Sequence, residues 1–160
     1  MSDATFRPFT PADAPWLVAR HGRLYAQQDG FDGTFAPLVA QILADFIADH
    51  DHRREAGWIT EVADQPVGSI FCVRQDDDTA KLRLFLLEPH LRGQGLGQRM
   101  LTHCMGFARS AGYMRMELWT HASHSAACAL YARNGWQVTA AQAVHSFGQD
   151  LVAQSWKIDL

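Results

Sequence analysis

EPHLRGQGLG, residues 88 to 97, is the stretch that decides the fold of this 160-residue chain. It follows an apolar run that Pro89 stops, and its glycines at 93, 95 and 97 open a segment with apolar residues at helical spacing. Glycine adopts backbone conformations barred to other residues and has no side chain to block a ligand. The free N–H groups of a first helical turn, backed by the helix dipole, bind anions. We therefore predict a strand, a turn and a helix whose N-terminus holds a phosphate or diphosphate.

The glycine pattern is also compatible with different kinds of turn. It could form a glycine-rich turn that binds no ligand. It could also belong to a dinucleotide-binding Rossmann unit, because Glu117 lies about 20 residues after Gly97, where such a unit keeps its ribose-binding acid. Against it, the glycines run GxGxG and not GxGxxG, and a long segment precedes them. A nucleoside-triphosphate P-loop is excluded because no Lys-Ser or Lys-Thr follows.

Composition limits the class of protein. The length fits a single domain over residues 1–160. The net charge is −3 and the basic residues are dispersed, which argues against nucleic acid as a partner. No segment is apolar and long enough to span a membrane, and the start MSDATFRPF is no signal peptide. Three cysteines in apolar surroundings, Cys72, Cys104 and Cys128, indicate reduced, buried thiols in a cytoplasmic protein.

Periodicity predicts an alternation of strands and helices. TPAD, residues 10–13, combines an N-cap, a proline and an acid, which is typical of a helix start. We expect strands at 4–9, 58–63, 67–74, 82–87, 113–120, 136–140 and 151–160, and helices at about 10–28, 34–49, 96–111 and 125–133. Residues 64–66 would turn the first hairpin, and 82–87 is typical of a central strand apolar on both faces. The order predicts a mixed α/β sheet with helices on both faces.

Two blocks carry a resemblance to a known family. RGQGLG matches the acyl-coenzyme A signature (Gln or Arg)-x-x-Gly-x-(Gly or Ala) of the GNAT superfamily N-acetyltransferases, with Arg92, Gly95 and Gly97 at the defining positions. SHSAACALYARNGW, Ser123 to Trp136, is similar to that family's later block, commonly SNxxAxxLYxxxGF. The resemblance implies a GNAT fold, a mostly antiparallel sheet of about seven strands. It implies transfer of an acetyl group from acetyl-CoA to a primary amine by direct attack.

Two further segments, residues 20–35 and 145–160, resemble the acetyltransferase half of bacterial fusion proteins that carry a MarR-type winged-helix domain in front. We expect no such front domain in this chain. The resemblance then implies that the enzymatic half can stand alone, and it gives no reason to expect DNA binding.

The resemblance also implies roles for individual residues. The diphosphate would lie on the glycine-loop amides and the pantetheine arm on the preceding strand, where the Leu87 N–H would polarise the thioester carbonyl. Tyr131 would protonate the departing thiolate. We expect Arg92 to be a positioning or a solvated residue rather than a catalytic one. The coenzyme-binding residues implied are Phe85, Leu86, Leu87, Arg92, Gly93, Gln94, Gly95, Leu96, Gly97, Gln98, His124 and Tyr131.

This chain departs from the family pattern at two positions. His124 replaces an asparagine, and we expect it to hydrogen-bond the pantetheine. Trp119 replaces the glutamate that several members use as a base. Glu117, two residues earlier on the same face of the strand, is our candidate for the base. The other candidates are His145, His21 and Tyr25, although His21 shares an apolar helix face, which favours a buried, hydrogen-bonded histidine.

The pattern of His, Cys and aromatic residues bears on metals, partners and the acceptor. His121, His124 and Cys128 have a spacing that could hold a metal, but no fourth ligand is suitably placed, so we expect no bound metal.

The long alternating final strand could pair across a homodimer. A non-catalytic sensor that binds acyl-CoA or a small ligand is the alternative function. Aromatic residues hint at a small, partly apolar amine, but a peptide or a protein N-terminus stays open; these residues are Trp16, Tyr25, Phe31, Phe35 and Trp119.

Overall fold

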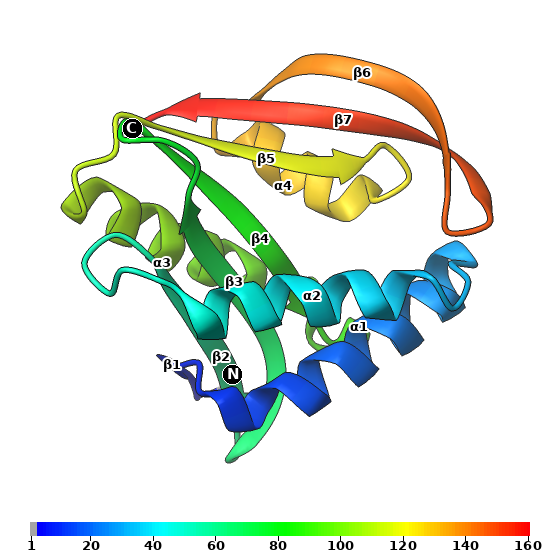
Figure 1. Ribbon diagram of the computed structural model, residues 1–160, viewed down its shortest axis with the longest axis horizontal. Helices are drawn as coiled ribbons and strands as arrows, with labels where there is room; N and C mark the ends of the chain where they lie inside the picture. Colours follow the sequence, from blue (N-terminus) through cyan, green and yellow to red (C-terminus); the bar gives the residue numbers. More distant parts are fainter. Residues whose placement is uncertain (1–2) are drawn as a thin grey trace.

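Seven strands in the order β1-β2-β3-β4-β5-β7-β6 form one sheet in the computed structural model, which describes residues 3–160 (Figure 1). The elements in chain order are β1 (Ala4–Pro8), the 3-10 turn η1 (Pro11–Asp13), α1 (Ala14–Asp29), α2 (Phe35–Ala48), β2 (Ala56–Val62), β3 (Gln65–Arg74), β4 (Thr79–Leu87), the 3-10 turn η2 (Pro89–Leu91), α3 (Leu96–Ser110), β5 (Arg115–His121), α4 (Ser125–Arg133), β6 (Gln137–Ser146) and β7 (Gln149–Asp159). All neighbouring strands are antiparallel except β4 and β5, which run parallel. The predicted fold class is confirmed.

Helices α1 and α2 cover one face of the sheet (Figure 1). The helical segment begins where the TPAD motif predicts, since the Asp13 carboxylate accepts a hydrogen bond of 2.8 Å from the Thr10 N–H. It ends at Gly30, which takes the left-handed conformation with φ 70°. The apolar stripes of both helices pack against Ile59 and Phe71 of the sheet. Burial of these stripes, rather than helix propensity, holds the two helices on this face.

On the opposite face lie α3 and α4 (Figure 1). Leu96, Met100 and Cys104 of α3 are buried, as their helical spacing predicts. Leu130 and Tyr131 fix α4 against the same cluster. The glycine loop therefore enters a helix whose inner face is anchored in the core, and this anchoring holds the loop in place.

Strand β4 contains a bulge that opens the sheet. Ser69 pairs with Leu86 and Phe71 pairs with Arg83, so β4 has one residue more than β3 between these pairs. Leu84 lies in this bulge with φ 50°, and its carbonyl accepts a hydrogen bond of 2.6 Å from the Ser69 hydroxyl. Strand β5 pairs with β4 only from Thr79–Arg115 to Lys81–Glu117. Beyond these pairs the two strands fan apart (Figure 1).

Several expected strand boundaries were wrong. The first hairpin turns on Ala63 and Asp64 alone, both with positive φ (52° and 61°), so residues 65 and 66 belong to β3. Strand β4 begins at Thr79 and carries half-buried Lys81 and Arg83, so it is not apolar on both faces. Strand β6 continues to Ser146, because an exposed edge strand shows no apolar alternation that would mark its length.

The final strand lies inside the sheet, where β5 pairs along one side of it and β6 along the other. A strand with both sides paired has no free edge, so β7 is not available to pair across a homodimer, and a homodimer through another surface stays a prediction. Cys72 and Cys104 are buried as expected, whereas Cys128 is only half-buried; none of the three forms a disulfide. Within residues 3–160, no helix has the length and apolar character needed to cross a membrane.

Candidate functional site

The glycine loop presents an uncapped helix N-terminus to an open space. Gly93 and Gly95 have φ of 77° and 80°, and a Cβ added to either would meet no protein atom within 4 Å. Gly95 is the N-cap of α3, which receives no side-chain cap and has no acidic residue in its first turn. The backbone N–H groups that begin α3 thus retain their positive field for a ligand. This arrangement fits an anion such as a diphosphate.

A cavity of about 490 Å³ lies in front of this loop, and we call it the glycine-loop cavity. Its wall includes Gly93, Gly95, Gly97 and two cations, Arg92 and Arg133. The Arg92 side chain is held by hydrogen bonds to the Leu87 carbonyl (3.2 Å) and to Gln28 (3.3 Å). Arg92 therefore connects the end of β4 to α1, in keeping with a positioning role.

Side-chain contacts fix the elements that surround the loop. Glu88 accepts two hydrogen bonds from Arg20, of 2.7 and 2.6 Å, which tie the loop to α1. Gln98 and Asn134 exchange two amide hydrogen bonds, of 2.7 and 2.8 Å, which join the start of α3 to the end of α4. The Gln98 side chain is thereby engaged, whereas its backbone N–H belongs to the free first turn of α3. Such supports preorganise a binding site.

The end of β4 offers a backbone edge to the same cavity. The Glu88 N–H donates to the Val67 carbonyl (2.8 Å), and the register pairs Gly68 with Leu87. In an antiparallel ladder this alternation turns the amide of Leu87 away from β3. Strand β5 does not pair with β4 at this level, so the edge of Phe85–Leu87 faces the gap between the two strands. An extended ligand with amide groups can pair there as an added strand would.

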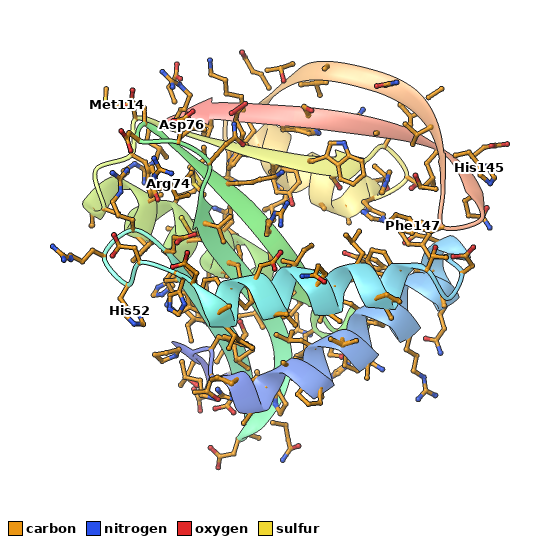
Figure 2. All side chains as sticks on the ribbon, viewed as in Figure 1. His52, Arg74, Asp76, Met114, His145 and Phe147 are labelled. Carbon is orange, nitrogen blue, oxygen red and sulfur yellow. The ribbon has the colours of Figure 1, made fainter. Side chains whose placement is uncertain are left out.

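On the other side of the gap lies a second cavity of about 310 Å³, the aromatic cavity. Helices α1 and α2, strands β4 and β5 and the β6–β7 hairpin all contribute to its wall. The two cavities meet at shared lining residues, which are Tyr25, Phe85, His124 and Ala127. Phe147 belongs to the same wall and lies on the side of its hairpin toward the helices, whereas His145 points outward (Figure 2).

Tyr131 on α4 lines the aromatic cavity and is 4% exposed. Its ring packs on Trp136 and Trp156, with centroids 5.7 and 5.8 Å away. Burial, with a smaller contribution from Tyr25, raises the pKa of the Tyr131 phenol well above its usual range. The phenol therefore stays protonated at neutral pH and is available as a proton donor.

His124 connects the cavities through a short polar chain. Its Nε2 lies 3.1 Å from Asp29 Oδ2, and its Nδ1 lies 3.3 Å from the Thr120 hydroxyl. Because a carboxylate only accepts, the Nε2 proton points to Asp29 and Nδ1 is left as the acceptor. The Tyr25 ring covers the imidazole at 5.1 Å between centroids. This Asp-His-Thr arrangement matches the geometry of an oriented general base.

The other candidate bases are placed differently. Glu117 is absent from the linings of both cavities, and its carboxylate accepts a 2.8 Å hydrogen bond from Gln75 instead. His145 is exposed and pairs with Asp150 at 2.9 Å. Tyr25 lines both cavities, but burial raises the pKa of its phenol to about 12. The structure therefore does not bring Glu117 or His145 together with Tyr131.

His21 lies in the aromatic cavity wall and is 1% exposed. Its Nδ1 donates to the Leu17 carbonyl at 2.8 Å, while its Nε2 is buried without a partner among the described residues. Burial lowers the pKa of this imidazole to about 4, so it is neutral. The expected hydrogen bond is thus present on one nitrogen and missing on the other.

Sequence reasoning missed Asp29, Thr120, Lys81 and Arg83. Nothing in the sequence pairs Asp29 with His124, because 95 residues separate them along the chain. Lys81 and Arg83 did leave a signal, since two cations alternate in the otherwise apolar run TAKLRLFLL.

As for a metal, residues 3–160 contain no group of three His, Cys, Asp or Glu side chains close enough to hold one.

Comparisons with known proteins agree with this site. The sequence pattern of the acetyltransferase (GNAT) family matches residues 20–136, which is more than half of the chain. No curated protein sequence matches significantly.

Solved structures share the fold at low identity. Ribosomal-protein-alanine N-acetyltransferase from Brucella melitensis is 20% identical with a TM-score of 0.76, covering 98% of this chain and 99% of its own. A Salmonella typhimurium protein solved with its cofactor acetyl-CoA is 18% identical with a TM-score of 0.75, covering 99% and 95%. A GNAT acetyltransferase from Streptococcus pneumoniae is 17% identical with a TM-score of 0.75, covering 99% and 100%. From the family match over both sequence blocks, with the fold in agreement, this chain belongs to the acetyltransferase (GNAT) family.

Proposed function

We propose that this protein transfers the acetyl group of acetyl-CoA to the amine of a small acceptor. The observation that carries the proposal is the meeting of two cavities at Phe85 and His124, one in front of the free helix N-terminus and one lined by aromatic rings. Acetyl-CoA supplies a thioester that a neutral amine attacks, so that a C–N bond forms and the C–S bond breaks. Family membership and the acetyl-CoA-bound Salmonella typhimurium protein of similar fold support the choice of donor.

The chain's own groups suit the binding of acetyl-CoA. The amides of residues 93–98 would hold the diphosphate, with Arg92 and Arg133 adding positive charge at the cavity wall. The free edge of Phe85–Leu87 would pair with the pantetheine arm. The Leu87 N–H would then donate to the thioester oxygen as negative charge develops on it.

Two proton transfers remain, and the polar groups at the junction suit both. Tyr131 would protonate the departing thiolate, since its phenol is protonated and lines the acceptor cavity. His124 would accept the proton of the attacking amine at Nδ1, directly or through Thr120, with Asp29 orienting the ring. We propose this histidine in place of Glu117, whose carboxylate lies outside both cavities.

The finer resemblance, to the acetyltransferase half of MarR-type fusion proteins, stays a prediction. Its first segment, residues 20–35, contributes His21, Tyr25, Phe31 and Phe35 to the aromatic cavity. We infer that any relative that shares this segment shares part of the acceptor site.

The proposal predicts that Tyr131→Phe lowers turnover by about 10²–10⁴-fold, the usual contribution of a general acid, while acetyl-CoA affinity changes little. Thiol release measured over a panel of primary amines, with calorimetric titration of acetyl-CoA, checks both quantities. Tyr113→Phe is the matched control, because Tyr113 donates its hydroxyl to the Arg54 carbonyl and lines neither cavity.

Equal turnover in the Tyr131→Phe variant and the wild type would remove the tyrosine from the mechanism. Tight binding of acetyl-CoA without transfer to any amine would contradict the proposed function and favour a sensor of the same fold.

A further inference from the structure

Lys81 and Arg83 line the aromatic cavity without a partner of opposite charge. They alternate along β4, and both are half-buried. Neither side chain forms a hydrogen bond or an ion pair with another residue of the described part, 3–160. Every other residue in the lining of this cavity is neutral or a histidine. The cavity wall thus carries two positive charges that no hydrogen bond or ion pair among the described residues neutralises.

The nearest acids, Glu117 and Asp45, attract these cations only weakly, because in both cases the loss of hydration is the larger effect on the pKa. Glu117 of β5 accepts a hydrogen bond from Gln75, and Asp45 of α2 accepts one from Gln41, both at 2.8 Å. Neither acid lines the cavity. Loss of hydration lowers the pKa of Lys81 and also that of Arg83, which shows that both cations are held where their charge is costly. A bound anion would offset this cost.

The remainder of the wall suits a flat apolar group. Phe147 lies 4.8 Å from Phe31 and 5.0 Å from Phe35 between ring centroids, and Tyr25 lies 4.8 Å from Phe35. These rings come from α1, the loop after it, α2 and the β6–β7 hairpin, whose turn lies beside the loop between the two helices (Figure 2). Aromatic groups pack on such rings with a specific geometry.

Spacing along β4 limits the distance between the anionic group and the amine of an acceptor that binds in the aromatic cavity. Phe85 lies at the junction of the two cavities, two residues beyond Arg83. Two residues of chain span at most about 7 Å, and the bulge at Leu84 lies between Arg83 and Phe85, so the two positions are close together. An acceptor held by Arg83 therefore has its amine only a few bonds from its anion.

We propose that the acceptor is a free aromatic amino acid whose carboxylate pairs with Arg83 and Lys81 and whose amine lies at the cavity junction beside His124. The inference rests on the proposed acetyltransferase function and names the class of its acceptor. A guanidinium can bind a carboxylate through two parallel hydrogen bonds, which would give Arg83 the larger share of recognition.

Matched pairs of ligands test the anion site without requiring catalysis. L-tryptophan is compared with tryptamine, and L-phenylalanine with phenethylamine, by calorimetric titration in the presence of saturating coenzyme A. We expect each amino acid to bind about 10- to 100-fold more tightly than its decarboxylated amine, which is the range for a hydrogen bond to a charged group. L-alanine, which lacks the ring, should bind more weakly than either amino acid.

Variants then assign the effect to a residue. Arg83→Gln should remove most of the preference for the carboxylate while the affinity for tryptamine stays within about 3-fold, because the lost interaction is with the anion alone. Arg53→Gln, at an exposed position outside both cavities, is the charge-matched control and should retain the preference. Should Arg83→Gln fail to fold, as judged by loss of a cooperative thermal transition, Lys81→Gln carries the same test with a smaller expected loss of preference.

Equal affinities for the amino acid and its amine, or no binding of either, would overturn the anion site. An Arg83→Gln variant that lowers the affinity for the amino acid and for its amine equally would also overturn it. Thiol release separates this inference from the proposed function. Binding that depends on the carboxylate, without acetyl transfer, refutes the proposed function and supports the anion site. Equal acetyl transfer to amines with and without a carboxylate supports the proposed function and refutes the anion site.

Discussion

His124 lies at the junction of the cavities, hydrogen-bonded toward Asp29 and Thr120. The family pattern often has an asparagine at this position, which could bind pantetheine but could not accept a proton. His124 supplies a basic nitrogen in a chain whose Trp119 replaces the glutamate that several members of the family use as a base. We infer that one departure from the pattern compensates for the other.

Substitution by the residue common in the family separates the two roles of this histidine. His124→Asn should lower kcat by about 10²-fold or more if the imidazole is the base, while the KM for acetyl-CoA changes little. Steady-state kinetics with each substrate varied in turn measures both parameters. Asp29→Asn, which removes only the orienting charge, should have a smaller effect. Retention of wild-type kcat in the asparagine variant would leave His124 with the pantetheine contact alone.

His21 makes the stability of the fold sensitive to acid. The pKa of its imidazole is about 4 in the folded protein and 6.5 in an ordinary environment, because burial disfavours the charged form. The unfolded chain therefore binds a proton at a higher pH than the folded one does. The stabilising contribution is complete above pH 6.5 and is lost as the pH falls toward 4.

We predict that His21→Met flattens this dependence. Between about pH 7 and pH 5, the wild type should lose about 2 kcal/mol more free energy of unfolding than the variant does. Urea denaturation at the two pH values measures the difference. Parallel losses in the two proteins would mean that His21 does not stay neutral in the folded state.

At the scale of elements, the N-terminus of α3 is the part on which coenzyme binding depends. Gly95 takes a left-handed conformation and faces open space, so a side chain there both strains the backbone and enters the cavity. Gly112, just beyond the C-terminus of the same helix, has a similar φ of 93° and equally open surroundings but lines neither cavity. A side chain at Gly112 would strain the backbone only, whereas one at Gly95 would also obstruct the ligand, so comparing the two substitutions separates these effects.

Gly95→Val and Gly112→Val should each destabilise the fold by about 1–2 kcal/mol, the cost of a left-handed conformation for a residue with a side chain. Only the first should weaken acetyl-CoA binding, by about 10-fold or more, because only there does the side chain displace the ligand. Thermal unfolding and calorimetric titration of both variants give the two numbers. Equal affinities in the two variants would argue against the glycine-loop cavity as the coenzyme site.

Sequence patterns predicted some elements well and others poorly, for physical reasons. An apolar stripe with helical spacing predicted α2 to within a residue at each end, since such a stripe reflects packing against a core. The pair Asn134-Gly135, a common helix end, predicted where α4 stops. Strand β6 is exposed along most of its length, so no apolar alternation marks residues 141–146 as strand. The bulge at Leu84 depends on the Ser69 hydroxyl, which lies on a different strand, so it has no local signal.

For the whole molecule, the central feature is the separation of β4 from β5 beyond Lys81 and Glu117. The bulge at Leu84 turns one strand away, and helices from opposite faces of the sheet converge on the gap, α1 from one side and α4 from the other (Figure 1). The two sequence blocks that carry the resemblance lie at this gap. The glycine motif and Tyr131 could therefore be predicted from sequence, whereas the contact between Asp29 and His124 required the tertiary structure.

The proposed function depends on one claim, that the free amides at the start of α3 hold the diphosphate of acetyl-CoA. Calorimetric titration of the wild-type protein with acetyl-CoA and with S-acetylpantetheine, which has the same thioester arm but no diphosphate, tests it most directly. We predict saturable 1:1 binding of acetyl-CoA and an affinity for S-acetylpantetheine lower by about 10²-fold or more, since several charge-assisted hydrogen bonds are lost. Equal affinity for the two compounds, or no heat with either, would contradict the claim.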